Sequence, residues 1–367
     1  MTPAPPTPAS LHRALRPGAL VAITAAATLA LAGCSSPGSE SGAAEGDALR
    51  VVATTTQLTD FAAQVGGEDI ALTGLLTAGA SAHHFDPSAS DLLELGRADV
   101  LIVNGAGLET FIDSAVESSG FDGTIIVASD GIDLHEAEEI TAEGQGAIDH
   151  DHDGDGTPDH AADNHADEHA DAPATADDHA DEHADATATA DAAADAHDHG
   201  DVNPHLWTSP QYAADMVTEI AAGLAAADPA HAEGYTDRAS AYVAQLDALD
   251  TWIAAQFDRV PEADRVLVSG HDSLRYYLHD YDIAYAGAIL PSFEDNAEPS
   301  AAEIDSLVAA IREQGVKAIF VESSMSPKLA EAVASEAGVI VVDASALYAD
   351  SLGTDDGTDT YIGRSEE

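Results

Sequence analysis

The sequence predicts an α/β protein with two lobes, each built on a parallel sheet, that one long helix joins. Short apolar segments of strand length alternate with segments of helical periodicity in both halves of the chain, which is typical of parallel sheets covered by helices. Between the halves, residues 230–261 carry apolar residues at helical spacing for about thirty positions. The chain of 367 residues is long enough for two domains of ordinary size.

The first lobe is predicted over residues 48–140 and is completed by residues 203–229. A strand that leads into a helix is expected at 49–68, further strands at 70–76, 99–107 and 124–129, and helices at 90–98 and 108–120. The segment at 99–107, DVLIVNGAG, is an apolar run that ends in a glycine turn, as expected of a buried strand. Pro229 is expected to close a helix over 202–229.

The linking helix is predicted over residues 230–259 and the second lobe over 260–367. At 1.5 Å per residue the linking helix is about 40–45 Å long, enough to run along both lobes. In the second lobe, strands are expected at 265–270, 283–289, 316–324 and 339–344, with helices at 271–281, 300–315 and 326–338. Ser300 and Glu303 form the pattern of a capping box at the start of one of these helices.

Residues 141–202 interrupt this pattern and are predicted to form a disordered insertion. They are rich in His, Asp, Glu, Ala, Thr and Gly, and the octapeptide HADEHADA occurs twice. Such a segment buries too little apolar surface to offset the entropy lost on ordering. Within it, Asp151, Asp153 and Asp155 match the start of a calcium loop, but position twelve is Ala162 rather than Glu. A weak Ca²⁺ site is therefore an open alternative there.

The N-terminus has the pattern of a signal peptide. Arg13 and Arg16 precede an apolar stretch that is short for a membrane span, and the stretch ends in LAGC with the chain's one cysteine, Cys34. This ending resembles a bacterial lipobox, so residues 1–33 are predicted to be removed and Cys34 to be lipidated; a secreted protein with a stray thiol is the alternative. Residues 34–47 are expected to be a flexible tether. We expect the mature protein outside the cytoplasmic membrane, anchored to it by lipid.

Composition limits the classes of partner. The chain has 67 acidic and 12 basic residues, a formal net charge of −55, and no Lys or Arg between Arg97 and Arg238. Such a surface repels nucleic acid and attracts cations, so no nucleic acid is expected as a partner. Solubility or salt tolerance also explains the acidity, which therefore does not decide the function. A single cysteine excludes a disulfide framework and thiolate metal sites in the mature chain.

Four residues that lie just after predicted strands or at a helix start are candidate metal ligands: His83, His205, His271 and Asp350. Ligand-binding crevices of α/β sheets form at such positions. Three imidazoles and one carboxylate complete a tetrahedral shell for Zn²⁺. With two residues from each lobe, the metal is expected in the cleft between the lobes.

The other histidines outside the insertion are weaker candidates. His84 is an alternative to its neighbour His83. His231 and His279 lie in helical patterns and are interpreted as ordinary helix residues, and His135 has no obvious partner in the sequence.

The four candidate ligands lie, in chain order, in the motifs GASAHHFDPSASD, NPHLW, SGHDSLRYY and YADSLG, and GTDTYIG follows them. In the order of these motifs, and from about Leu49 to Tyr361, the sequence resembles the zinc and manganese receptors of ABC importers (cluster A-I). These are bacterial extracytoplasmic lipoproteins with two (β/α)4 lobes and a rigid linking helix. Two departures stand out. Asn203 replaces the family's aspartate before the second ligand. Family members also continue past DTYIG with a closing helix, whereas this sequence stops at Glu367, so the helix is either dispensable or truncated.

The resemblance implies a Zn²⁺ receptor that is a monomer, delivers its ion to an ABC permease and is not an enzyme. Histidine at the third ligand position, His271, is typical of the zinc members, whereas manganese members have glutamate there. Zinc members also carry a His-rich insertion at this place, so we expect the insertion's histidines to capture zinc. These are His150, His152, His160, His165, His169, His179, His183, His197 and His199.

Three alternatives remain open from the sequence: a manganese receptor, an adhesin or zinc buffer without a permease, and a zinc hydrolase. Asp350 argues against the hydrolase because it fills the coordination position that a hydrolytic zinc site leaves open. The sequence also lacks HExxH and GxSxG motifs.

Overall fold

The structure, a computed structural model, describes residues 48–146, 202–290, 292–293, 298–322, 327–342, 348–355 and 357–366. All of them belong to one compact unit, Gly46–Glu367. The predicted signal peptide, the lipidated Cys34, the tether, and the insertion from residue 147 to 201 lie outside the described residues.

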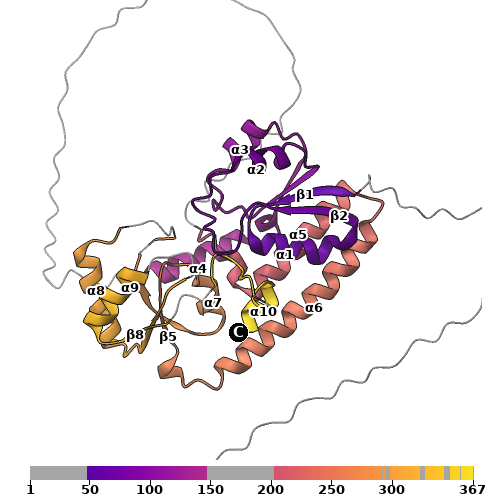
Figure 1. Ribbon diagram of the computed structural model, residues 1–367. Coiled ribbons are helices and arrows are strands. Elements are labelled where there is room, and N and C mark those ends of the chain that lie inside the picture. Colours follow the sequence, from indigo (N-terminus) through magenta and orange to yellow (C-terminus); the bar gives the residue numbers. More distant parts are fainter. Residues whose placement is uncertain are drawn as a thin grey trace, which may run out of the picture. The chain divides into compact units, whose positions relative to one another are not determined.

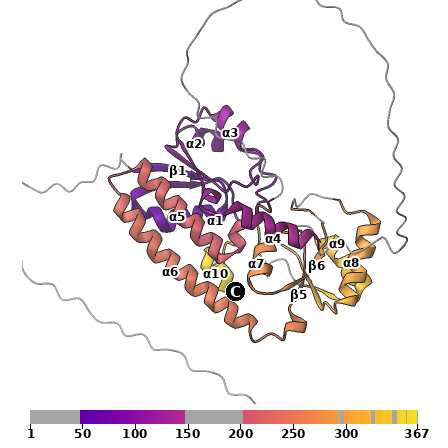
Figure 2. The same cartoon turned by 180° about the vertical axis from the view of Figure 1, so that it is seen from behind.

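A four-stranded parallel sheet forms the first half of the fold. Its strands, in the spatial order β2-β1-β3-β4, are β1 (Leu49–Ala53), β2 (Ile70–Gly74), β3 (Val100–Val103) and β4 (Thr124–Val127). All four residues of β3 are buried, as its unbroken apolar run predicts. Helices α1 (Thr56–Gly66), α2 (Ala89–Leu95) and α3 (Ile112–Ser119) connect the strands. Figures 1 and 2 show α2 and α3 on the opposite side of the strands from α1.

Helix α4 (Leu134–Gly146) extends beyond the predicted end of the first lobe at residue 140. Its Thr141 is buried and accepts a hydrogen bond from the backbone N–H of Asn203 at 3.1 Å, and its hydroxyl lies 3.3 Å from that of Tyr276. The first six residues of the predicted insertion are therefore helical. The contacts of Thr141 with Asn203 and Tyr276 hold this end of the helix, and sequence periodicity cannot show such long-range contacts.

Two long helices follow the insertion. Helix α5 (Pro210–Ala227) starts at Ser209, whose hydroxyl accepts from the N–H of Tyr212, and it packs on α1, β3 and β4. Helix α6 (Ala232–Phe257) has 26 residues, about 39 Å at 1.5 Å per residue.

Helix α6 contacts both halves of the fold. Near its start the Arg238 guanidinium donates to the carbonyl of Val65 at 2.6 Å, and near its end Asp250 accepts from the hydroxyl of Tyr281 at 2.8 Å. Figure 1 shows α6 running beside α5 and α10. It therefore has the place that the sequence predicts for the linking helix.

The second half contains two parallel strand pairs, β5 (Val266–Ser269) with β6 (Ala284–Ala288) and β7 (Ala318–Phe320) with β8 (Ile340–Val342). Strand β5 also lies against β7. The helices are α7 (Arg275–Asp280), α8 (Ala301–Glu313), α9 (Pro327–Ala337) and α10 (Tyr361–Glu366). The predicted capping box of α8 is confirmed, because both reciprocal hydrogen bonds between Ser300 and Glu303 form. Short 3₁₀ helices occur at Gly67–Asp69, Ala128–Gly131, Leu206–Thr208 and Glu262–Asp264.

The buried apolar side chains of the described residues form two clusters. The larger contains Phe61, Trp207 and Tyr361, and the smaller contains Val268 and Ile311. Ala349, which precedes Asp350, also belongs to the larger cluster, so the end of the chain returns to the first half of the fold.

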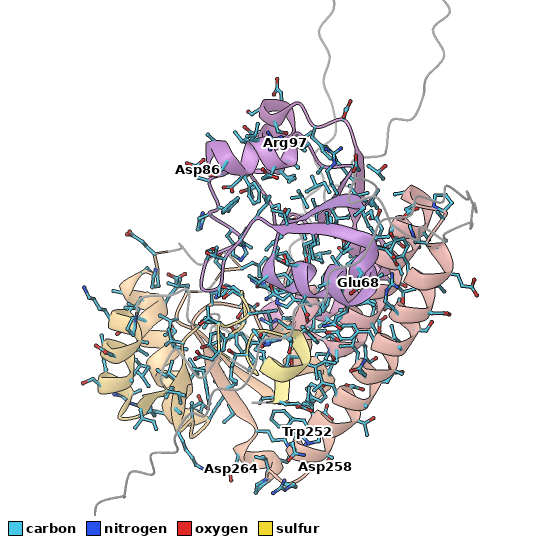
Figure 3. All side chains as sticks on the ribbon, turned by 45° about the vertical axis from the view of Figure 1, so that its right-hand side comes forward. Glu68, Asp86, Arg97, Trp252, Asp258 and Asp264 are labelled. Atoms are coloured by element: carbon cyan, nitrogen blue, oxygen red, sulfur yellow. The ribbon has the colours of Figure 1, made fainter. Side chains whose placement is uncertain are left out.

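Many charged side chains lie on the outside of the fold. Figure 3 shows Glu68, Asp86, Asp258 and Asp264 at the surface, and all four are exposed. Among the described residues, no helix is both long enough and apolar enough to cross a bilayer.

Candidate metal centre

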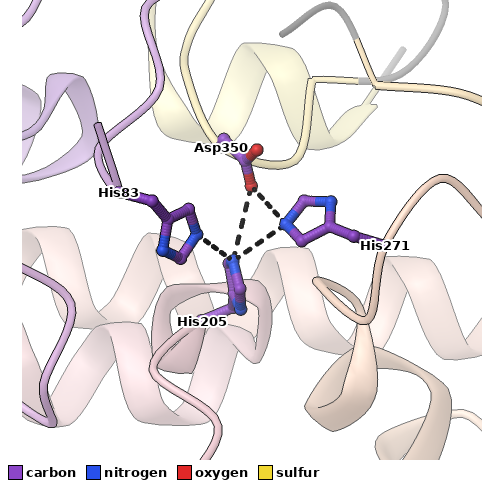
Figure 4. A group of neighbouring side chains, drawn as sticks. All are labelled: His83, His205, His271 and Asp350. Atoms are coloured by element: carbon purple, nitrogen blue, oxygen red, sulfur yellow. Dashed lines mark hydrogen bonds and ion pairs between the residues drawn. The ribbon is translucent and has the colours of Figure 1, made fainter. Parts of the chain in front are cut away.

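Four side chains from distant parts of the chain meet in one buried cluster: His83, His205, His271 and Asp350. Each offers one ligand atom, and these atoms all lie within 4.8 Å of one another. The four residues are at most 3% exposed. Figure 4 shows the three rings and the carboxylate turned toward a common centre. The structure thus brings together all four residues that the sequence marks as candidate ligands.

The distances within the cluster suit a tetrahedral ion. His205 Nε2 lies 3.1 Å from His83 Nε2, 3.2 Å from His271 Nε2 and 3.5 Å from Asp350 Oδ1. His271 Nε2 is also 3.5 Å from that carboxylate oxygen. Bonds of about 2.0–2.2 Å to a tetrahedral Zn²⁺ place neighbouring ligand atoms about 3.3–3.6 Å apart. The cluster therefore has nearly the dimensions of a four-coordinate site.

Each of the four residues follows a regular element or sits in a turn. His83 lies between β2 and α2, and His205 directly precedes the 3₁₀ helix Leu206–Thr208. His271 comes two residues after the end of β5, where its carbonyl accepts from the Ser269 hydroxyl at 2.6 Å. The loops that follow the carboxyl ends of two parallel strands, β2 and β5, thus supply two of the histidines.

The side chain of Asn203 fixes the ring of His205. Asn203 Oδ1 lies 2.7 Å from His205 Nδ1 and 3.1 Å from the backbone N of the same residue. An amide oxygen can only accept, so Nδ1 carries the proton and Nε2 presents its lone pair to the centre of the cluster. The Asn203 amide, which replaces the family's aspartate, thus supports His205 as a hydrogen-bond acceptor.

A buried carboxylate lies behind His271. Glu322, two residues after β7, is 1% exposed, and its Oε1 lies 3.4 Å from His271 Nδ1. The Ser273 hydroxyl donates to the same oxygen at 2.7 Å. A carboxylate in this place favours the proton on Nδ1 and increases the basicity of Nε2.

The turn that carries Asp350 is tied to the first half of the fold. The carbonyl of Ala349 accepts from Trp207 Nε1 at 2.8 Å and from Gln57 Nε2 at 3.3 Å. The Ser351 hydroxyl accepts from the N–H of Gly79 at 2.8 Å. Asp350 is therefore held by contacts with residues more than 140 positions away in the sequence.

Burial governs the charge state of the central ring. Removal from water, followed by the positive charge that His271 and His83 carry when protonated, lowers the pKa of His205 well below the usual imidazole value. Neutral imidazole is the form that binds a metal ion. Burial thus favours the neutral form of His205, which is the form that can bind a metal ion.

The other predicted residues lie elsewhere or outside the described part. His84 is exposed, so His83 and not His84 takes part in the cluster. His135 lies in α4, His279 in α7, and His231 at the start of α6 beside Asp228. The insertion's nine histidines, the calcium candidates Asp151, Asp153 and Asp155, and Cys34 all lie outside the described residues. Sequence reasoning missed Glu322; the only signal was an acidic residue at the end of an apolar strand.

Comparison with known proteins identifies relatives of this arrangement. Residues 51–367 match the family described as zinc-uptake complex component A periplasmic (ZnuA). The manganese-binding lipoprotein MntA of Bacillus subtilis (strain 168) is 27% identical over 338 residues, 91% of this chain and 90% of MntA. The iron ABC transporter substrate-binding lipoprotein MtsA of Streptococcus pyogenes serotype M1 is 24% identical over 330 residues, 88% and 86% of the two chains. The structure of the periplasmic zinc binding protein TroA from Treponema pallidum has a TM-score of 0.65 and 21% identity, and the match covers 87% of this chain and 95% of TroA.

The likeness to TroA confirms the predicted fold class, α/β with two parallel-sheet lobes. The metals in the relatives' names differ, so the comparisons establish metal binding without selecting one metal. Because the family match spans most of the sequence, this chain belongs to the ZnuA family, the extracytoplasmic metal-binding receptors of ABC importers, which are binding proteins and not enzymes.

Proposed function

We propose that this protein binds Zn²⁺ at His83, His205, His271 and Asp350 and delivers it to an ABC permease. The observation that carries the proposal is the buried cluster of three imidazoles and one carboxylate at tetrahedral spacing. Neutral nitrogen ligands suit Zn²⁺, whereas Mn²⁺ favours more oxygen ligands and a higher coordination number. One tight Zn²⁺ per chain in a competition titration supports the proposal, and equal or tighter binding of Mn²⁺ contradicts it.

Manganese is the second candidate, and the likeness to MntA favours it. Most nitrogen and oxygen sites bind Zn²⁺ more tightly than Mn²⁺, so the preference of one protein alone is a weak test. A more informative test compares the ratio of the Zn²⁺ and Mn²⁺ affinities between the wild type and a variant of His271.

His271→Glu is expected to weaken Zn²⁺ binding by roughly 10- to 100-fold and to reduce the preference of Zn²⁺ over Mn²⁺. The physical reason is that a hard carboxylate replaces a softer imidazole nitrogen. Competition titrations of both ions against one chelator measure the ratio. An unchanged ratio would show that residue 271 is not a ligand.

Glu322 gives this experiment a matched control. In His271→Glu the new carboxylate stands close to Glu322, and two buried carboxylates at short range repel each other. The double variant with Glu322→Gln removes that repulsion, so it should accept Mn²⁺ better than His271→Glu alone. Glu322→Gln alone should keep the preference for Zn²⁺, because it leaves all four ligand atoms in place.

We propose that the protein binds its ion as a monomer. All four proposed ligands belong to one chain, so a monomer suffices for binding.

We propose that a lipid on Cys34 holds the receptor at the outer face of the cell membrane, near its permease. Growth that becomes limited by zinc after deletion of the gene distinguishes an importer from an adhesin or a zinc buffer.

We propose that the nine histidines of the insertion capture zinc for the buried cluster. Deleting residues 147–200 spares α4, Val202 and all four proposed ligands. The tight site should therefore survive, while weaker zinc equivalents disappear and loading from a competing chelator slows. Calorimetry and stopped-flow loading compare the two forms; loss of the tight site on deletion would place that site in the insertion.

A further inference from the structure

The side chain of Asn203 touches both histidine-bearing segments. Its Oδ1 accepts from the backbone N–H of His205, and its Nδ2 lies 2.6 Å from the backbone carbonyl of Asp272. These partners fix the orientation of the amide, because a backbone N–H can only donate and a carbonyl can only accept. Asp272 is the residue after His271. One buried side chain thus joins the segment of His205 to the segment of His271.

An aspartate cannot make both contacts. One carboxylate oxygen could accept from His205 as the amide does, but the other would face the Asp272 carbonyl oxygen with no hydrogen between them. Two acceptors at hydrogen-bond distance repel, and a buried carbonyl that loses its donor is left unsatisfied. The amide at position 203, where the family motif has aspartate, therefore adds a contact that the carboxylate lacks.

The surroundings of Asn203 leave it little freedom. It is fully buried. Its backbone N–H donates to Thr141 Oγ1 at 3.1 Å, and its carbonyl accepts from the Tyr276 hydroxyl at 2.6 Å. The carbonyl of Pro204, the next residue, accepts from Asn104 Nδ2 at 3.0 Å. With its backbone held on several sides, the amide acts from a fixed position.

We propose that Asn203 is a positioning residue that ties the His271 segment to His205 and thereby slows release of the bound ion. The hydrogen bond to Asp272 holds the two Nε2 atoms 3.2 Å apart, close to the separation of about 3.3–3.6 Å between two ligands of one tetrahedral ion. Opening the site then requires that bond to break as well as the bonds to the metal. This inference rests on the proposed function, because it assumes that both histidines bind the ion.

Asn203→Asp separates this role from simple support of His205. If the amide only supports His205, the variant should release Zn²⁺ at the same rate or more slowly, because a carboxylate is the stronger acceptor behind a metal-bound imidazole. If the amide ties the two segments, release should be about tenfold faster, which is the effect of losing one buried hydrogen bond. The two accounts predict opposite directions.

The matched control is Asn104→Asp. Asn104 follows β3, and its buried amide donates to the carbonyl of Pro204 and to that of Gly105, so the variant removes an amide donor to the loop of Asn203 without touching Asp272. The experiment loads the full chain and both variants with Zn²⁺ and follows the slowest phase of release to excess chelator. Release about tenfold faster in Asn203→Asp, and much closer to wild type in Asn104→Asp, supports the proposal. Equal acceleration in both variants, or none in Asn203→Asp, overturns it.

A second measurement uses only the wild-type protein. In the NMR spectrum of the wild-type chain, one side-chain N–H proton of Asn203 should exchange slowly and show coupling across the hydrogen bond to the Asp272 carbonyl. Rapid exchange of both protons overturns the proposal. Failure of the wild type to bind one tight Zn²⁺ would count against the proposed function, whereas normal binding with unchanged release in Asn203→Asp counts only against this inference.

Discussion

Replacing His205 with alanine is expected to lower the affinity for Zn²⁺ by more than about 100-fold, since even loss of a group that only supports a ligand costs about 10- to 100-fold. His205 Nε2 is the central atom of the cluster, within 3.5 Å of the other three ligand atoms. Its loss leaves three donors and an incomplete tetrahedron. The stabilisation of the protein by Zn²⁺ in thermal unfolding should fall accordingly.

His84→Ala is the control for that variant. His84 neighbours a proposed ligand but is exposed and outside the cluster, so its removal should change the affinity little. Chelator competition on the two variants and the wild type measures the difference. Equal affinity in His205→Ala and wild type would mean that the tight site lies outside this cluster.

The affinity for Zn²⁺ should fall as the pH drops below about 6.5, because protons compete with the ion for imidazole nitrogen. Each ordinary imidazole costs up to tenfold in affinity per pH unit below that value, so three would cost about 1,000-fold between pH 7.5 and 5.5. Burial lowers the pKa of His205, so this ring stays neutral at lower pH and competes less. We therefore expect a loss of more than about tenfold but clearly less than 1,000-fold.

The measurement is chelator competition at several pH values, corrected for protonation of the chelator. A flat affinity between pH 7.5 and 5.5 would contradict the histidine ligands. A fall of the full 1,000-fold would instead show that the protein does not keep His205 neutral.

Local patterns in the sequence predict most of the fold. The apolar run of β3, the long periodic segment of α6 and the capping box of α8 are local signals, and each element lies where its signal places it. Helix α4 was not predicted, and the insertion was predicted to begin inside it, at residue 141. Its residues from 141 to 146 resemble the polar insertion in composition, and Thr141 is held through Asn203 and Tyr276, which are far away in the sequence.

The candidate ligands can also be named from the sequence, but their supports cannot. His83, His205 and His271 each follow a recognisable element or motif, and local reading suffices for that. Glu322 reaches His271 across 51 positions, and the Asn203 amide reaches Asp272 across 69. Which polar side chain contacts the second ring nitrogen of a histidine depends on how distant strands and loops pack together. Local patterns in one sequence do not show that packing.

The central claim is that one ion binds among His83, His205, His271 and Asp350. Anomalous X-ray scattering at the zinc edge, from crystals of the protein loaded with one equivalent of Zn²⁺, tests it most directly. The account predicts one strong peak about 2.0–2.2 Å from the three Nε2 atoms and from a carboxylate oxygen of Asp350. A single strong peak elsewhere, with no density at the cluster, would contradict it.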